Sequence, residues 1–292
     1  MSTQVGRNHK ETAAPPAKGD HAHAPWKASV VAELALVITN EAMNDEYRHL
    51  VVSCGEEAAR AKPGQFFQLL CPHPPTGEQP FLRRPMSLYG ADPETRQVAF
   101  LYKVTGAGTR GLDTLKSGDR LDIMGPLGQG FVLDPRWRHI VVVGRGAGLA
   151  TLAPLAQAAH RVGTAVTAIL SARRPELLVS QETFAHHGAE VIAVTDSQAS
   201  SGPANVERIL RQLIADGRCD AFFTCGSSRL MRVQQRLAHE FGLPGQVAME
   251  QQMACGIGLC HCCVRDFRVD GEIVNRRVCC DGPVFNLMEA LP

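Results

Sequence analysis

The stretch HIVVVGRGAGLATLAPLA, residues 139–156, decides how the middle of this 292-residue chain folds. An apolar run leads into a glycine-rich turn and then into a segment with helical spacing, which predicts a strand, a tight turn and a helix. Gly144, Gly146 and Gly148 would let the backbone approach a dinucleotide pyrophosphate at the helix N-terminus. The third glycine comes too early for G-x-G-x-x-G, so a tight turn without a ligand stays open as the alternative.

The same rhythm continues to residue 249. Apolar runs alternate with helical stretches, which predicts a Rossmann-like domain over 136–249, with a parallel sheet flanked by helices. The runs are IVVVG, AVTAILSA, EVIAVTD, AFFTCG and QVAME. We expect Asn205 to cap one helix, which Gly217 ends, and a second helix over about 228–241.

The residues after the second of these runs bear on the choice of nucleotide. An acidic residue that binds the ribose is usual there for NAD, but this chain has SARR at 171–174. Arg173 and Arg174 offer contacts to a 2′-phosphate. The sequence therefore leaves NADP open beside NAD.

Upstream, residues 28–135 contain short β-type runs separated by proline and glycine signals, which predicts an antiparallel β-barrel. Within it, FLRRPMSLYG at 81–90 sets Arg84, Pro85 and Ser87 on an expected strand. A guanidinium can neutralise a pyrophosphate and a hydroxyl can hydrogen-bond the edge of a flavin ring, although a surface arginine pair is the plainer interpretation. The turns VTGAGTRGL at 104–112 and GPLGQGF at 125–131 either face phosphates or simply join strands.

Downstream, residues 250–292 hold a concentration of cysteines. Cys255, Cys260 and Cys263 follow the spacing C-x4-C-x2-C, and Cys279 arrives 16 positions later, which is typical of a plant-type [2Fe-2S] cluster. Gly256 and Gly258 would let backbone N–H groups approach the sulfurs. A zinc site is the alternative, because four cysteines also hold zinc. Two further cysteines, Cys262 and Cys280, are expected to be spectators.

Composition excludes several classes of function. The formal charge of +1 offers no electrostatic footprint for nucleic acid. The most apolar stretch, 139–160, is interrupted by Arg145 and glycines, so no membrane span is expected. Residues 1–27 read as a flexible tail without a secretory signal, and a cysteine cluster fits metal or redox chemistry in the reducing cytoplasm.

The order of barrel, nucleotide domain and cysteine module resembles the electron-transfer subunit of NAD-linked dihydroorotate dehydrogenase, within the ferredoxin-NADP reductase superfamily. The resemblance rests on RRPMS, GAGT, GPLGQGF, VVVGRGAG, CGSSRLM, MACGIGLCHCCV and VCCDGPVF. It implies that FAD is bound by Arg84, Pro85, Met86, Ser87, Gly108 and Thr109, and that Cys225 and Gly226 lie beside the nicotinamide. Ser87 and Cys225 are then the residues nearest the chemistry, although a buried strand-end thiol is an equal interpretation of Cys225. The chain departs from the family at Thr151 and Ser227, where proline is usual.

The resemblance also implies the activity. Electrons would pass between a partner catalytic subunit that binds FMN, the [2Fe-2S] cluster, FAD and NAD(H), in dihydroorotate oxidation for pyrimidine biosynthesis. Two copies of each chain would form a heterotetramer, with the stretch DGPVF, 281–285, exposed as a docking face. The alternatives are a reductase subunit of the same build serving a hydrogenase or another pyrimidine-transforming enzyme, and a zinc or regulatory module without catalysis.

Overall fold

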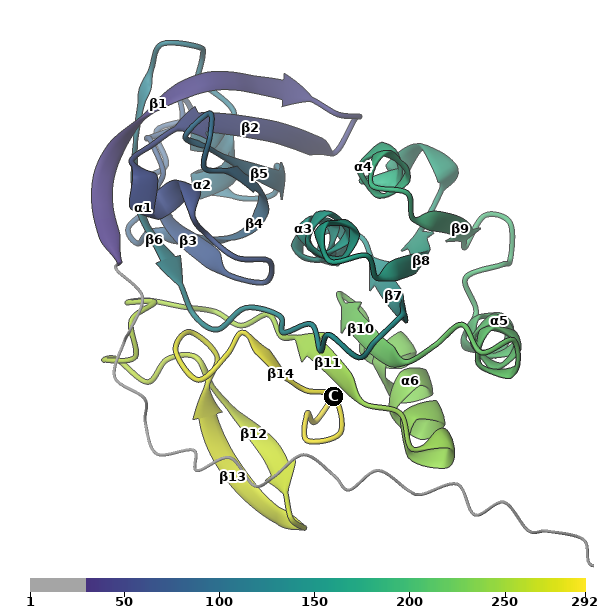
Figure 1. Ribbon diagram of the computed structural model, residues 1–292. Helices are drawn as coiled ribbons and strands as arrows, with labels where there is room; N and C mark the ends of the chain where they lie inside the picture. The colour runs from purple at the N-terminus through teal and green to yellow at the C-terminus, as the bar shows by residue number, and fades with distance from the viewer. Residues whose placement is uncertain (1–29) are drawn as a thin grey trace, which may run out of the picture.

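The first domain is a closed antiparallel barrel, as expected. A computed structural model describes residues 30–292, so the tail expected at 1–27 lies outside the described residues. The barrel strands follow the order β1-β2-β5-β4-β3-β6 (Figure 1). Their bounds are β1 (Val31–Ala42), β2 (Tyr47–Ser53), β3 (Phe66–Leu70), β4 (Arg84–Asp92), β5 (Gln97–Lys103) and β6 (Arg120–Leu127). Two short helices, α1 (Glu56–Ala59) and α2 (Ala107–Leu112), lie in its loops.

Strand β3 has two differently buried faces, which matters for the site. Phe67 and Leu69 point into the barrel core with Leu50 and Phe100. Phe66, the first residue of the strand, belongs instead to the apolar cluster that includes Cys263 and Cys279 of the C-terminal module. Because side chains alternate along a strand, the barrel presents one face of β3 to the cysteine module.

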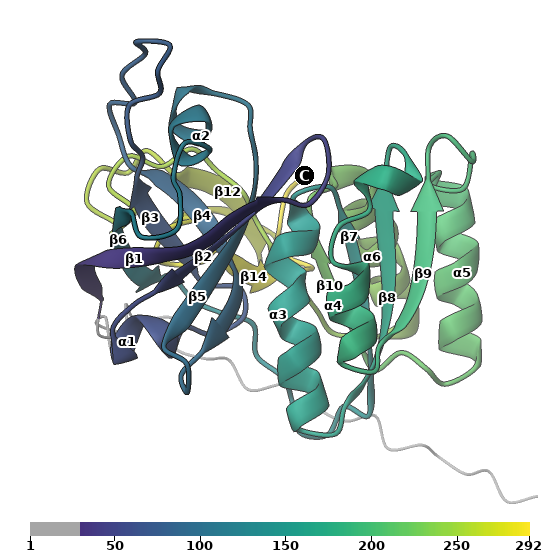
Figure 2. The same ribbon diagram turned by 90° about the horizontal axis from the view of Figure 1, so that it is seen from above.

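The second domain is the expected parallel α/β layer. Its strands are β7 (His139–Arg145), β8 (Ala165–Ala172), β9 (Glu190–Thr195), β10 (Ala221–Cys225) and β11 (Gly245–Ala248). Helices α3 (Gly148–Arg161) and α4 (Gln181–His186) cover the face of the sheet toward the barrel, and α5 (Pro203–Ala215) and α6 (Ser228–Phe241) cover the other (Figure 2). A 3-10 turn, Pro175–Leu177, follows β8.

The predicted end of α5 is confirmed, but its predicted start is wrong. Gly202 caps α5 in extended backbone and Pro203 begins it, because proline already has the helical φ and needs no N–H partner there. Asn205 lies inside the first turn, and its side-chain amide donates to the carbonyl of Ser200 at 2.8 Å. Gly217 follows the helix with a φ of 68°, as a glycine after a C-terminus should.

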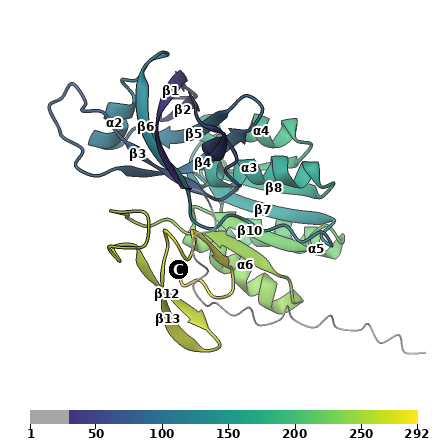
Figure 3. The same ribbon diagram turned by 60° about the vertical axis from the view of Figure 1, so that its left-hand side comes forward.

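The C-terminal segment lies against both other domains (Figure 3). A hairpin of β12 (Val264–Val269) and β13 (Glu272–Arg277) follows the cysteine loop, and β14 (Val284–Asn286) then pairs antiparallel with β11. The sheet order is therefore β14-β11-β10-β7-β8-β9. The last segment thus completes the sheet of the second domain, which the boundary drawn at 249/250 does not anticipate.

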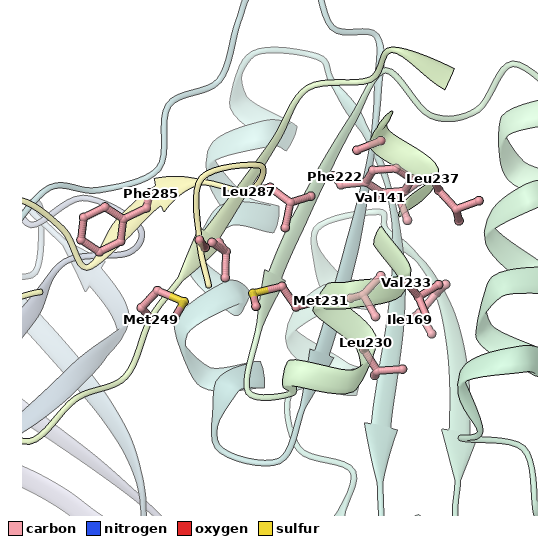
Figure 4. Close-up of a cluster of buried hydrophobic side chains, with 14 of the residues drawn as sticks. Val141, Ile169, Phe222, Leu230, Met231, Val233, Leu237, Met249, Phe285 and Leu287 are labelled. Carbon is pink, nitrogen blue, oxygen red and sulfur yellow. The ribbon is translucent and has the colours of Figure 1, made fainter. Parts of the chain in front are cut away.

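This pairing also corrects the exposed docking face expected at 281–285. Gly282, Pro283, Val284 and Phe285 are buried. Figure 4 shows Phe285 and Leu287 beside Met249, in the same apolar cluster as side chains of α6 and the sheet. Burying these side chains stabilises the junction, so apolar residues near the chain end form an interface within the protein and not an exposed face.

Among residues 30–292, no helix is both long and apolar enough to cross a membrane.

Candidate functional site

Residues expected to hold the flavin lie together where β4 begins. Arg84, Pro85, Met86 and Ser87 open this strand and are all partly exposed. Helix α2 begins beside them: a Cβ on Gly108 would lie 2.9 Å from both Cγ and Nε of Arg84. The structure therefore brings the two segments implied by the resemblance into contact, and glycine at 108 leaves room for the arginine.

The neighbouring arginine has a different role. Arg83 donates to both carboxylate oxygens of Asp122 on β6, at 2.9 and 2.8 Å. Arg84 has no carboxylate partner among the described residues; its guanidinium donates only to the nearby carbonyls of Leu82 and Arg83. Arg84 is thus the guanidinium left for an anionic ligand.

The side chain of Thr109 stabilises the turn that leads into helix α2. Its Oγ1 accepts hydrogen bonds from the backbone N–H groups of Thr105 and Gly106, at 2.8 and 3.0 Å. Such a contact satisfies N–H groups that the start of a helix leaves without partners. Thr109 therefore shapes the turn that faces Arg84.

The glycines expected at a dinucleotide line a pocket of about 290 Å³ between the first two domains. Its walls are Gly146 and Gly148 from the turn after β7, Gly226 after β10, and Tyr47 and Lys103 from the barrel. A Cβ on Gly148 would lie 2.6 Å from the carbonyl carbon of Cys225. The two turns therefore touch through their backbones, and only glycine fits. Gly144 lies deeper, in β7, where Leu149 and Leu152 occupy the space of a side chain.

Cys225 ends β10 and is only 2% exposed. Burial raises the pKa of its thiol well above the ordinary value, and the negative charge of Glu250 raises it further. Thr151, close to the thiol, lowers this pKa in part. The cysteine is therefore a neutral thiol at physiological pH, and Thr151, which departs from the family pattern, acts on it directly.

Charged residues around the pocket form ion pairs that the sequence does not predict. Glu46, in the loop between β1 and β2, pairs with Lys103 at 2.6 Å and also with Arg173, which follows β8. Lys103 and Arg173 lower the pKa of Glu46. Arg145 bonds Asp196 at 2.6 Å and Ser171 at 2.8 Å. No sequence signal links these positions, because the partners lie far apart along the chain.

The predicted iron ligands meet in two pairs. The backbone N–H of Cys260 donates to the sulfur of Cys255 at 3.4 Å, and that of Cys279 donates to the sulfur of Cys263 at 3.4 Å. Among residues 30–292, no group of three or more His, Cys, Asp or Glu side chains surrounds one ion position. Two sulfur pairs suit two irons with two thiolates each.

Backbone N–H groups surround these sulfurs. Ile257 and Cys260 donate to the sulfur of Cys255 at 3.5 and 3.4 Å, and Gly258 donates to that of Cys279 at 3.2 Å. Burial opposes a thiolate at Cys255, but these donors outweigh it and lower the pKa to about 7. These donors favour negative sulfur at Cys255, whereas burial raises the pKa of the Cys279 thiol. Four thiols with N–H donors beside them fit a [2Fe-2S] cluster.

The two expected spectators differ in position. Cys262 is exposed and its thiol points to the carbonyl of Gln252 at 3.8 Å. Cys280 is partly buried. Its thiol donates to the carboxylate of Asp281 at 3.6 Å and lies beside Cys279. Cys279, by contrast, is buried and donates its own N–H to the sulfur of Cys263 at 3.4 Å. Cys279 is the better placed ligand, and its assignment stays a prediction.

Comparison with known proteins points to one family. Residues 250–290 match the family model of the iron-sulfur cluster binding domain of dihydroorotate dehydrogenase B. The chain is 33% identical to the dihydroorotate dehydrogenase B (NAD(+)) electron transfer subunit of Desulforamulus reducens, over 78% of this chain and 86% of that one. It is 31% identical to the protein of the same name from Streptococcus pneumoniae, over 87% and 96%.

A solved structure agrees along most of the chain. It is described as that of an NADH-dependent reduced ferredoxin-NADP oxidoreductase involved in flavin-based electron bifurcation. The TM-score is 0.72 at 27% identity, with 88% of this chain and 89% of that one covered. Together with the sequence relatives, these findings show that the chain belongs to the family of dihydroorotate dehydrogenase B electron transfer subunits.

Proposed function

We propose that this chain is the electron-transfer subunit of an NAD-linked dihydroorotate dehydrogenase that acts in pyrimidine biosynthesis. Family membership over most of the chain carries the proposal. Bound FAD exchanges a hydride with NAD and single electrons with a [2Fe-2S] cluster, so it is the converter between the two. The chain's own residues bind these groups, hold them in order and supply no strong acid or base.

Each carrier has its own residues in this proposal. Arg84, Gly108 and Thr109 hold the FAD pyrophosphate, while Pro85, Met86 and Ser87 lie along the flavin ring. Gly144, Gly146, Gly148 and Gly226 admit the nucleotide, with Cys225 as the neutral thiol beside the nicotinamide. Cys255, Cys260, Cys263 and Cys279 ligate the cluster.

The partner is a catalytic subunit that binds FMN, in an assembly with two copies of each chain. Its relatives are named electron transfer subunits, and this name supports a separate catalytic chain. Leu259, at the tip of the cysteine loop, is 76% exposed, and Cys260 beside it is exposed too. We place the partner's contact at this loop. The enzyme works in the reducing cytoplasm, where thiolates stay available for iron.

A second candidate function is a reductase subunit of the same build that serves another oxidoreductase. The bifurcating oxidoreductase that shares the fold at 27% identity favours it. Copurification separates the two, because each candidate requires a different catalytic partner.

The isolated chain, loaded with its cofactors, is expected to reduce an artificial dye with NADH but not to oxidise dihydroorotate. Adding the FMN-containing subunit should restore dihydroorotate oxidation coupled to NAD reduction. The measurement is steady-state absorbance of dye and of NADH, with the visible spectrum recorded first. Dihydroorotate turnover by the single chain, or a colourless protein that contains zinc, would contradict the proposal.

The arginine pair before β4 allows a matched test of the flavin site. Arg84→Ala is expected to weaken FAD binding about 10- to 100-fold, because a hydrogen bond to a charged group contributes about 1.5–3 kcal/mol. Arg83→Ala removes the same charge one residue earlier, where Asp122 already holds it. Its FAD affinity should be nearly unchanged. Fluorescence titration of the apoprotein with FAD measures both, and equal losses would contradict the assignment.

A further inference from the structure

Gln68, in the middle of β3, has a side chain that the fold has buried without a partner. Its exposed fraction is 0%. Neither the amide nitrogen Nε2 nor the amide oxygen Oε1 has a hydrogen-bond partner among the described residues. An unpaired buried amide costs about 1–3 kcal/mol for each lost hydrogen bond. Such a group needs a ligand that the polypeptide does not supply.

Gln68 lies between the strand of the proposed flavin site and the loop of the proposed iron-sulfur cluster. Its register partner on β4 is Pro85, two residues before Ser87, so it shares a sheet face with the flavin strand. The cysteine loop covers it: a Cβ on Gly256 would lie 2.5 Å from Nε2 of Gln68. Gly256 has a φ of 71° and directly follows the ligand Cys255. The amide therefore lies between the flavin strand and the first cysteine of the loop.

The burial of Gln68 bears on whether its amide faces the flavin or the iron-sulfur cluster. Arg84, Pro85, Met86 and Ser87 remain partly exposed, as expected of a strand that lines an open flavin site. Gln68, by contrast, is fully buried, and Gly256 of the cysteine loop lies directly against its amide. The backbone against the amide is that of the cysteine loop, in which Gly256 directly follows the predicted iron ligand Cys255.

We propose that the Gln68 side-chain amide donates a hydrogen bond to sulfur at the Cys255 end of the [2Fe-2S] cluster. The inference rests on the proposed function, because it needs the cluster. Hydrogen bonds to cluster sulfur stabilise the reduced, more negative state and so raise the reduction potential. Gln68 is then a positioning residue through which the flavin barrel sets the potential of the cluster and fixes the cysteine loop beside it.

The test replaces Gln68 by methionine, which has nearly the same length and no N–H group. The holoprotein should keep its iron and sulfide, and its cluster should show a midpoint potential shifted to more negative values in an EPR-monitored titration. A merely structural role would alter thermal stability and leave the potential unchanged. Wild-type iron and sulfide with a wild-type potential would overturn the proposal.

Two further variants keep the test decisive. Gln234→Met, in α6, replaces another glutamine that is 0% exposed and has an unpaired side-chain oxygen, and it should leave the potential unchanged. Should Gln68→Met not take up iron, Gln68→Leu also removes the donor without adding a charge, and a wild-type potential there overturns the inference. A wild-type protein without any [2Fe-2S] signal would refute the proposed function instead, so the two failures are distinct.

Discussion

Cys279→Ser is expected to yield a protein that lacks iron and sulfide and shows no EPR signal after dithionite reduction. Cys279 donates its backbone N–H to the sulfur of Cys263 at 3.4 Å, receives the Gly258 N–H at 3.2 Å and is buried, so its sulfur faces the other predicted ligands and not solvent. Serine is a poor ligand for iron in such a site because the soft thiolate is lost. NADH–dye reductase activity should survive, because the flavin and nucleotide residues lie elsewhere.

Cys280→Ser and Cys262→Ser are the matched controls for this prediction. Cys280 is adjacent in sequence and its thiol contacts that of Cys279, whereas Cys262 points to a carbonyl at the surface. Both variants should retain full iron and sulfide by chemical assay. Cluster loss in Cys280→Ser with retention in Cys279→Ser would reverse the assignment of the fourth ligand.

Local patterns made much of this molecule predictable. The cysteine spacing specifies the cluster loop because three ligands must converge from a single short segment. The five apolar runs of the second domain all became strands, since each is long enough to be read without knowing its neighbours. The arginine-proline strand could likewise be placed, although its partner helix α2 was visible only as a glycine-rich turn.

The remaining features depend on contacts between distant parts of the chain. Strand β14 is three residues long, and it exists because β11 offers an open edge. Glu46 meets Arg173 across 127 positions. Gln68 looks like an ordinary strand residue in the sequence, and only the approach of Gly256 reveals its isolation. Such features follow from tertiary packing, which periodicity and spacing do not encode.

Gly226→Ala is expected to raise the KM for NADH by about 10- to 100-fold while leaving the flavin and cluster spectra intact. A Cβ at this position would lie 2.2 Å from the carbonyl oxygen of Arg145 and 3.1 Å from the Cα of Gly148. Both are backbone atoms that cannot rotate away, so the turns after β7 and β10 must separate. Overpacking of this kind costs about 1–3 kcal/mol, and here the strain falls on the walls of the nucleotide pocket.

The effect must be separated from the strain of the backbone conformation itself, because Gly226 has a φ of 86°. Gly242→Ala supplies the control: Gly242 has a φ of 66°, and nothing lies within 4 Å of an added Cβ. That variant should lose about 1 kcal/mol of stability from the left-handed backbone and keep the wild-type KM for NADH. Steady-state kinetics with a dye acceptor, beside thermal unfolding, measures both. Equal KM values for the two variants would show that contact between the two glycine turns does not shape the nucleotide site.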